Sequence, residues 1–342
     1  MKLLVTGGAG FIGSNFIHYM LEAQKDVQIL NFDCLTYAGN LANLSQLSSH
    51  PRYTFMRGDI TTGRDVERGM SQGIDAVINF AAETHVDRSI LDSTVFVRTN
   101  IEGTHLLLEV CRKKKVTRFI QVSTDEVYGS LGETGKFTEE SPLAPNSPYA
   151  ASKAAADLLI RAYHKTYGMD VMVTRCSNNY GPYQFPEKLL PLMILNALEN
   201  KPLPVYGDGL HRRDWIHVKD HCRALHRVLM EGRPGRVYNI GSDQERQNLE
   251  MVEQILALLE KSPELIQFVK DRPGHDRRYA IDATRLRREL SWKPQISLSE
   301  GLAQTVRWYQ ENALWVSHVR NGTYLEHYKK TYENRDQTLK DL

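Results

Sequence analysis

The feature that most limits the fold of this 342-residue chain is a glycine-rich segment placed directly after the first apolar run. Lys2–Thr6 has the Leu and Val content of a buried strand, and the next residues read Gly7-Gly8-Ala9-Gly10-Phe11-Ile12-Gly13. The segment fits G-x-G-x-x-G through Gly8, Gly10 and Gly13, and G-x-x-G-x-x-G through Gly7, Gly10 and Gly13. Glycine lets a backbone turn tightly and approach a pyrophosphate, and a helix start offers free N–H groups. A purely structural glycine turn is the alternative, so the surroundings must decide.

The first half of the chain alternates between short apolar runs and helix-like stretches. Such alternation predicts a Rossmann-like α/β fold, a doubly wound parallel sheet covered by helices on both faces. The predicted strands are Lys2–Thr6, Gln28–Phe32, Tyr53–Arg57, Ala76–Phe80, Phe119–Ser123 and Val171–Thr174, and the predicted helices are Gly13–Ala23, Gly63–Met70, Ser93–Lys114 and Pro148–Tyr167. Ligands bind such sheets at the carboxyl ends of the strands.

The local composition changes after about Asn178, where Gly-Pro and Pro-Gly pairs become frequent. Helix-like stretches between them are Lys188–Glu199, Val218–Glu231 and Asn248–Leu259. We therefore expect a dinucleotide-binding domain over residues 1–177, a smaller mixed α/β lobe for substrate mainly over 178–320, and a tail over 321–342. This boundary is soft, because later segments can return to the first sheet.

Charge and cysteine content narrow the class of protein. The 43 Lys and Arg residues nearly balance the 41 Asp and Glu residues, giving a net charge of +2, which argues against a nucleic-acid partner. No apolar run reaches the ~20 residues that span a bilayer, and the N-terminus becomes a glycine loop too early for a signal peptide. The four cysteines (Cys34, Cys111, Cys176 and Cys222) form no C-x-x-C pair. We expect a cytoplasmic protein without a membrane partner or a metal site.

An acidic residue at the end of the second strand indicates which dinucleotide is bound. Asp33 lies 20 positions after Gly13, where a carboxylate can hold both ribose hydroxyls and would repel a 2′-phosphate. No Arg or Lys follows closely, so the sequence favours NAD over NADP. Residues at the ends of the third and fourth strands, namely Asp59, Ile60, Ala81 and Ala82, are expected to border the cofactor. A structural turn with a capping Asp is the alternative.

Tyr149 and Lys153 form a candidate acid–base pair. They are four positions apart and so share one face of the predicted helix, which Ser147 and Pro148 are suited to start. The helix dipole and the lysine charge are both expected to lower the pKa of Tyr149. A tyrosine tuned in this way can take the proton of a sugar hydroxyl while the hydride leaves for NAD. The spacing alone is weak evidence, and its place in a dinucleotide fold gives it weight.

Two adjacent carboxylates, Asp125 and Glu126, close the fifth strand after Thr124. Adjacent carboxylates repel, so one pKa rises and that group can donate a proton while the other accepts one. Oxidation of an alcohol needs only Tyr149. A further carboxyl pair indicates a further proton transfer, such as elimination of water. Helix capping is the alternative for this pair.

These motifs together resemble the extended short-chain dehydrogenase/reductase superfamily, and within it the nucleotide-sugar 4,6-dehydratases that act on dTDP-glucose. The resemblance runs from Met1 to about Trp315. The matching stretches are Val5–Ser14, Asn31–Asn40, Ala81–Ile90, Ser123–Gly129, Tyr149–Lys153, Cys176–Leu190, Arg213–Trp215 and Asp271–Tyr279. Related epimerases lack the Asp-Glu pair, and related decarboxylases and GDP-mannose dehydratases place Ser before the Glu. Asp125 is therefore the most informative residue.

The resemblance implies a reaction in three stages. Tyr149 takes the proton of the 4-hydroxyl, NAD takes the C4 hydride, and Lys153 and Thr124 assist. Glu126 then removes the C5 proton while Asp125 protonates the departing 6-hydroxyl. The hydride returns to C6, which gives dTDP-4-keto-6-deoxyglucose and water with no net redox change.

The resemblance also implies the residues that line the site. Expected NAD contacts are Gly7, Gly10, Phe11, Ile12, Gly13, Asp33, Leu35, Thr36, Asp59, Ile60, Ala81, Ala82, Thr99, Tyr149, Lys153 and Asn179. Expected substrate contacts are Thr84, Thr124, Asn178, Lys188, Leu189, Pro204, Tyr206, Arg213, Asn248, Arg272 and His275. His85, Asp87 and Arg88 match a family signature without an assigned role. The loop Arg272–Arg278 could otherwise be a solvated surface turn.

Some alternatives stay open at this stage. A 4-epimerase or decarboxylase of another nucleotide sugar would need no acid at position 125, and a silent NAD-binding regulator would need none of the five catalytic candidates. The resemblance implies a homodimer formed through the helices near Ser93–Lys114 and Pro148–Tyr167. Tyr324, Tyr328 and Tyr332 in the tail would share one helix face, which suits either a surface helix or a subunit contact.

Overall fold

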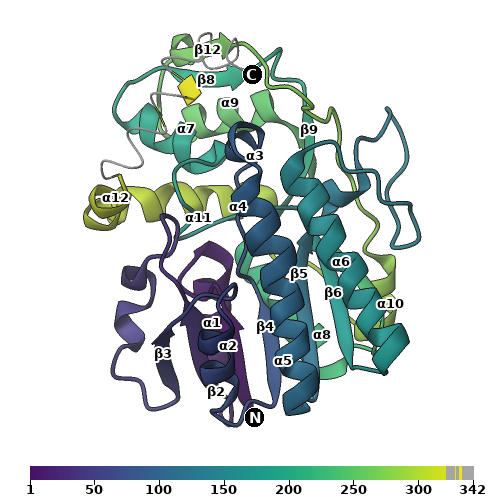
Figure 1. Ribbon diagram of the computed structural model, residues 1–342. Helices are drawn as coiled ribbons and strands as arrows, with labels where there is room; N and C mark the ends of the chain where they lie inside the picture. The colour runs from purple at the N-terminus through teal and green to yellow at the C-terminus, as the bar shows by residue number, and fades with distance from the viewer. Residues whose placement is uncertain (321–327, 329–330, 333–342) are drawn as a thin grey trace.

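The computed structural model of the chain contains a seven-stranded parallel sheet with the order β10-β6-β5-β4-β1-β2-β3 (Figure 1). It describes residues 1–320, 328 and 331–332. The strands are β1 Lys2–Thr6, β2 Gln28–Asp33, β3 Tyr53–Arg57, β4 Ala76–Asn79, β5 Arg118–Thr124, β6 Val171–Cys176 and β10 Val237–Ile240. The order reverses between β1 and β4, which opens a crevice at the carboxyl ends of the strands.

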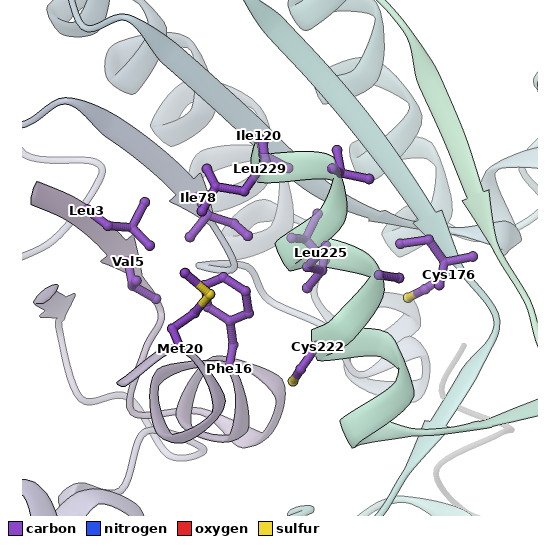
Figure 2. Packing of buried hydrophobic residues seen from close by; sticks show 14 of the residues in the cluster. Leu3, Val5, Phe16, Met20, Ile78, Ile120, Cys176, Cys222, Leu225 and Leu229 are labelled. Atoms are coloured by element: carbon purple, nitrogen blue, oxygen red, sulfur yellow. The ribbon is translucent and has the colours of Figure 1, made fainter. Parts of the chain in front are cut away.

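Helices cover both faces of this sheet, which confirms the predicted doubly wound α/β class. They are α1 Phe11–Ala23, α2 Gly63–Met70, α3 Val86–Leu91, α4 Thr94–Phe96, α5 Thr104–Lys114, α6 Pro148–Tyr167, α8 Val218–Glu231 and α10 Thr284–Leu290, with short turns η1 Leu41–Leu47 and η3 Asp125–Tyr128. One face packs against α1, α8 and α10, and the other against α2, α5 and α6. Figure 2 shows Phe16 and Met20 of α1 beside Leu225 and Leu229 of α8, against the strand residues Val5 and Ile78.

The second lobe has its own small sheets and its own core. A three-stranded sheet contains β7 Asn178–Tyr180, β9 Arg212–His217 and β11 Glu245–Gln247, and a parallel pair contains β8 Leu203–Tyr206 and β12 Ile266–Val269. The helical elements are α7 Leu189–Leu198, α9 Asn248–Leu258, η4 Pro263–Leu265, α11 Leu298–Glu311 and α12 Ala313–Val319. A separate cluster of buried apolar residues fills the space among α7, α9 and α11. The chain enters this lobe at β7, and later returns to the sheet as α8 and β10 (Figure 1).

Local signals explain why several element bounds match the predictions to the residue. In α6 the side chain of Ser147 accepts a hydrogen bond from the Ala150 N–H (3.1 Å), Pro148 occupies the first turn, and Gly168 follows in the left-handed conformation at φ 66°. Each signal acts within one turn of the helix, so the sequence alone carries it.

The stretch predicted as one helix over Ser93–Lys114 is divided in the structure. A π-helical segment, η2 Val97–Gly103, lies between α4 and α5. In its centre the Asn100 side chain accepts from the Glu83 N–H (2.9 Å) and donates to the Glu83 carbonyl (3.0 Å) and to Ser152 Oγ (2.8 Å). These long-range bonds are invisible to periodicity, and π segments often occur at functional sites.

Two of the tail tyrosines, Tyr328 and Tyr332, fall within the described part of the chain. The Asn196 side chain donates a hydrogen bond to Tyr328 Oη (3.2 Å), and the Tyr332 ring lies 6.0 Å from the ring of Tyr206. Both contacts are made within one copy of the chain, on the second lobe. Tyr324 lies outside the described residues. Among the residues that the structure describes, no helix is both long enough and apolar enough to cross a bilayer.

Candidate active site

A deep cavity lies at the carboxyl edge of the sheet, between the two lobes. It is lined by every predicted NAD contact except Leu35, by all five catalytic candidates, and by the substrate candidates Thr84, Thr124, Asn178 and Lys188. The topology explains this, because β1, β2, β4, β5 and β6 all end at this edge. Residues far apart in the sequence therefore face one space.

The glycine segment forms a cradle at the start of α1 that only glycine can make. Gly7 has φ 64°, and a Cβ there would lie 2.6 Å from the Ala81 nitrogen. A Cβ on Gly13 would lie 2.4 Å from the Gly7 carbonyl oxygen. Gly10 precedes the helix without a side-chain cap, so the N–H groups of the first turn stay available. This backbone suits the pyrophosphate of a dinucleotide.

Asp33 is held in one orientation at the end of β2. One carboxylate oxygen accepts from the Ala9 N–H (2.9 Å) and the other from the Leu35 N–H (2.8 Å). Burial raises the pKa of Asp33, and these two backbone bonds act in the opposite direction. Among the described residues that line the cavity, Lys153 and Lys188 are the only lysines and there is no arginine. With no cation beside Asp33 to receive a 2′-phosphate, the pocket fits NAD.

Asp125 and Glu126 lie side by side in η3, but in different electrostatic surroundings. Asp125 is only 2% exposed; burial, and next the charges of Glu126 and Asp214, raise its pKa well above the usual value. Burial also raises the pKa of Glu126, but Arg272, Lys188 and Arg213 all oppose that shift. Asp125 is thus suited to carry a proton and Glu126 to accept one. Thr124 links them, because its Oγ1 accepts from the Glu126 N–H (3.2 Å) and lies 3.3 Å from Asp125 Oδ1.

The pKa of Tyr149 shifts in the opposite direction from the one predicted. Burial, followed by the negative charge of Glu126, raises it well above the usual value, and a hydrogen bond with Thr124 opposes the shift only in part. Lys153 donates to the Val122 carbonyl oxygen (2.7 Å), and burial lowers its own pKa to about 8. The sequence argument counted the helix start and the lysine but not the desolvation of a ring that is 7% exposed.

The cationic candidates approach the site from three segments of the second lobe. Lys188 Nζ donates to the Thr84 carbonyl oxygen (2.9 Å). Arg213 donates to the Asp276 carbonyl oxygen (2.8 Å) and stacks on the Tyr279 ring at 4.3 Å. Arg272 has Asp87 and Glu126 as its strongest charge partners. All three cations oppose the rise in the pKa of Glu126, so all three lie near this carboxylate.

Eight predicted site residues do not line the cavity in this structure. They are Leu35, Leu189, Pro204, Tyr206, Arg213, Asn248, Arg272 and His275. Leu35 contributes through its backbone bond to Asp33, and Leu189 follows Lys188 as the first residue of α7. The Asn248 N–H donates to the His211 carbonyl oxygen (2.9 Å). Their contacts with cofactor or substrate stay predictions.

Two acidic residues that line the cavity, Glu83 and Glu187, were not predicted from the sequence. Glu187 accepts a hydrogen bond from Tyr37 Oη (3.0 Å) and pairs with Arg88 at 3.3 Å. The only available signal was the position of Glu187 beside Lys188. Its partners are about 100 and 150 residues away along the chain, and no local pattern contains them.

His211, Asp271 and His275 form the one group of potential metal ligands found among the described residues. The two imidazole rings stack at 3.8 Å, and Arg213 NH2 lies 3.0 Å from His275 Nε2. Because a guanidinium can only donate, His275 accepts there, and its Nδ1 carries the proton donated to Asp271 (2.6 Å). Burial, with Arg272 and Arg213 nearby, lowers the pKa of His275 to about 3. Hydrogen bonds therefore occupy both ring nitrogens of His275, and the arginine charges disfavour a metal cation at this point.

Comparison with known proteins gives a consistent answer. The family described as GDP-mannose 4,6 dehydratase matches residues 4–305. The dTDP-glucose 4,6-dehydratase of Xanthomonas campestris is 53% identical over 341 residues, covering 94% of this chain and 96% of the relative. A crystal structure of dTDP-glucose 4,6-dehydratase from Bacillus anthracis in complex with NAD superposes with a TM-score of 0.88 at 53% identity, covering 93% of this chain and 99% of that one.

A second solved structure agrees. DesIV, the dTDP-glucose 4,6-dehydratase of Streptomyces venezuelae with NAD bound, has a TM-score of 0.90 at 51% identity and covers 92% of this chain and 98% of that one. These similarities confirm the family resemblance of the motifs and the predicted fold class. The chain belongs to the dTDP-glucose 4,6-dehydratase family.

Proposed function

We propose that this chain converts dTDP-glucose to dTDP-4-keto-6-deoxyglucose and water, with NAD held as a recycling cofactor. The observation that carries the proposal is the pair Asp125 and Glu126, which share one wall of the cavity with Tyr149 but differ in their charge environment. An epimerase or a decarboxylase has no use for a protonated acid at this place. The glycine cradle and Asp33 fit NAD, which when bound accepts a hydride from the sugar and later returns it.

The side chains of the cavity divide the proton transfers among them. The phenolate form of Tyr149 takes the proton of the 4-hydroxyl, and the hydrogen bond from Thr124 to Tyr149 favours that form. Once C4 is a carbonyl, the C5 proton is acidic, and the Glu126 carboxylate removes it. Asp125 gives its proton to the 6-hydroxyl, which leaves as water. When C6 is reduced, Glu126 returns a proton to C5. Lys153 is held by its hydrogen bond to the Val122 carbonyl oxygen, one helical turn after Tyr149 on α6.

Three cations of the second lobe that lie near Glu126 suit a nucleoside diphosphate. Lys188, Arg213 and Arg272 carry the charge that two phosphates need, and arginine matches phosphate by its paired donors. The roles of these residues and of the other predicted contacts are part of the proposal.

We further propose a homodimer and a reducing compartment. Leu158 on α6 is 55% exposed, and Leu91 on α3 and Val95 on α4 are also exposed. Apolar side chains exposed along helices suit a subunit contact. The four cysteines are unpaired, and three of them are buried, as expected where thiols stay reduced.

One assay tests the proposed reaction. The protein is incubated with dTDP-glucose in deuterated buffer without an added reductant, and the product is analysed by mass spectrometry and NMR. We expect loss of one water and deuterium at C5. An unchanged mass with confirmed bound NAD would contradict the proposal, and full activity of D125N would indicate an epimerase or decarboxylase. The same assay with UDP-glucose measures the preference for the base.

A further inference from the structure

The first turn of α3 connects the chemical end of the cavity to its nucleotide end. The Ser89 hydroxyl accepts a hydrogen bond from the Tyr149 N–H (3.2 Å), and Ser89 itself is buried. The Arg88 guanidinium lies 3.8 Å above the Tyr37 ring and pairs with Glu187 at 3.3 Å. Arg88 and Ser89 therefore fix α3 against the walls of the cavity.

Asp87 projects from this fixed turn to a different partner set in the second lobe. Its Oδ2 accepts a hydrogen bond from Tyr206 Oη (3.1 Å), and its Oδ1 lies 3.8 Å from Arg272 NH1. The side chains of Asp87 and Arg272 are only 13% and 17% exposed, so water screens the pair weakly.

The two partners of Asp87 lie together because of the way the second lobe is built. Tyr206 is the last residue of β8, and it pairs in register with Val269, the last residue of β12. Because the strands are parallel, both end at the same edge, and the chain after β12 reaches Arg272 within three residues. One carboxylate can therefore hold the ends of both strands.

Arg272 lies between two negative charges. Burial opposes its ionisation, but Asp87 and then Glu126 keep the pKa of Arg272 above its usual value. Glu126 belongs to the chemical end of the cavity, so Asp87 determines how far Arg272 is drawn away from it.

We propose that Asp87 is a positioning residue that holds Arg272 and Tyr206 across the junction of the lobes, so that Arg272 meets the diphosphate of the substrate; this rests on the proposed function. Asp87 does not line the cavity that holds the catalytic candidates and the glycine cradle. Its loss should weaken the binding of the nucleotide and leave the chemical step nearly unchanged.

The test compares D87N and D87A with the control D92N, all assayed as the intact protein with its bound NAD. Asp92 follows α3 directly, and its Oδ1 accepts only a local exposed bond from the Thr94 N–H (2.9 Å). We expect KM for dTDP-glucose to rise about tenfold in D87N, as for loss of a charged partner, while kcat changes less than about threefold and NAD content stays constant. D92N should match the wild type, and D87E should recover part of the affinity.

A double-mutant cycle separates positioning from a merely structural role. If Asp87 acts through Tyr206, Y206F should raise KM less in the D87A background than in the wild type. Multiplicative effects of the two substitutions, or a lowered unfolding midpoint with unchanged KM, would overturn the proposal.

Direct titration with dTDP, followed by calorimetry, keeps this test independent of turnover. If the wild type binds dTDP but forms no dehydrated product, the proposed reaction fails while weaker binding of dTDP by D87N still supports the role of Asp87. If D87N binds dTDP as tightly as the wild type, the positioning role is refuted whatever the reaction. Absence of dTDP binding by the wild type would refute both.

Discussion

The two ends of the cavity are built in different ways. The chemical end consists of side chains on the sheet edge and on α6, such as Thr124, Asp125 and Tyr149, which lie within one or two residues of a strand or helix end. The proposed nucleotide side depends on long cations, such as Lys188 and Arg272, which come from separate loops and are held by carbonyls and carboxylates far along the chain. The first end can fix reacting atoms closely, and the second supplies charge and adapts to a flexible diphosphate. Substitutions at the first should therefore reduce kcat, and those at the second should raise KM.

The largest effect is expected for Y149F. Removing the phenol oxygen eliminates the group that takes the 4-hydroxyl proton, so kcat should fall by about 10³-fold. The matched control is Y167F on the same helix, because Tyr167 is 52% exposed. Product formation from dTDP-glucose measures both. Near-normal kcat in Y149F would remove Tyr149 from the chemistry.

D125N should reduce kcat for dehydration by about 10²-fold, because an amide cannot deliver a proton to the leaving hydroxyl. The raised pKa of Asp125 also predicts a pH effect. The acid is active while protonated, so its contribution is present at low pH and declines as pH rises through the raised pKa. The pH profiles of wild type and D125N should therefore converge at high pH, and parallel profiles would contradict an acid role.

At the nucleotide end, K188M should raise KM about tenfold while changing kcat little, as for one lost charged hydrogen bond. The control is K201M, since Lys201 is an exposed lysine of the same lobe, 53% exposed and paired with Glu199. Initial rates over a range of dTDP-glucose concentrations separate the two constants. A fall in kcat larger than the rise in KM would place Lys188 at the chemical end.

The smallest effect concerns stability. Burial lowers the pKa of Lys153 from 10.5 to about 8, so below pH 8 the buried positive charge destabilises the folded state. Between pH 8 and 10.5 the unfolded chain binds more protons, and the stability contributed by Lys153 therefore rises with pH. Urea unfolding should show that the free energy of unfolding of the wild type increases relative to that of K153M over this range. A constant difference would mean that Lys153 titrates normally in the fold.

The same division explains what the sequence could predict. The bounds of β1, β3, α2, α6 and α8 were predictable to the residue, because strand periodicity, caps and turn residues act locally. The glycine cradle and Asp33 follow from backbone geometry of the same kind. The family resemblance located the acidic pair, and the structure brings it into the cavity with Tyr149.

What could not be predicted depends on contacts between distant residues. β10 escaped notice because four residues carry little periodic signal and become a strand only by pairing with β6. The π segment in Val97–Gly103 depends on Asn100 reaching Glu83 and Ser152. The direction of the Tyr149 pKa shift depends on how much protein surrounds the ring, which no spacing of residues along the chain records.

Because the chain returns to the sheet as β10, it crosses between the two lobes more than once. A fragment that stopped at residue 177 would leave β6 with a bare edge, since its partner Val237–Ile240 arrives sixty residues later. It would also lack Leu225 and Leu229, which close the apolar face over α1 (Figure 2). Exchange of the substrate lobe between relatives therefore demands several splice points, and recombination at a single crossover would disrupt both halves.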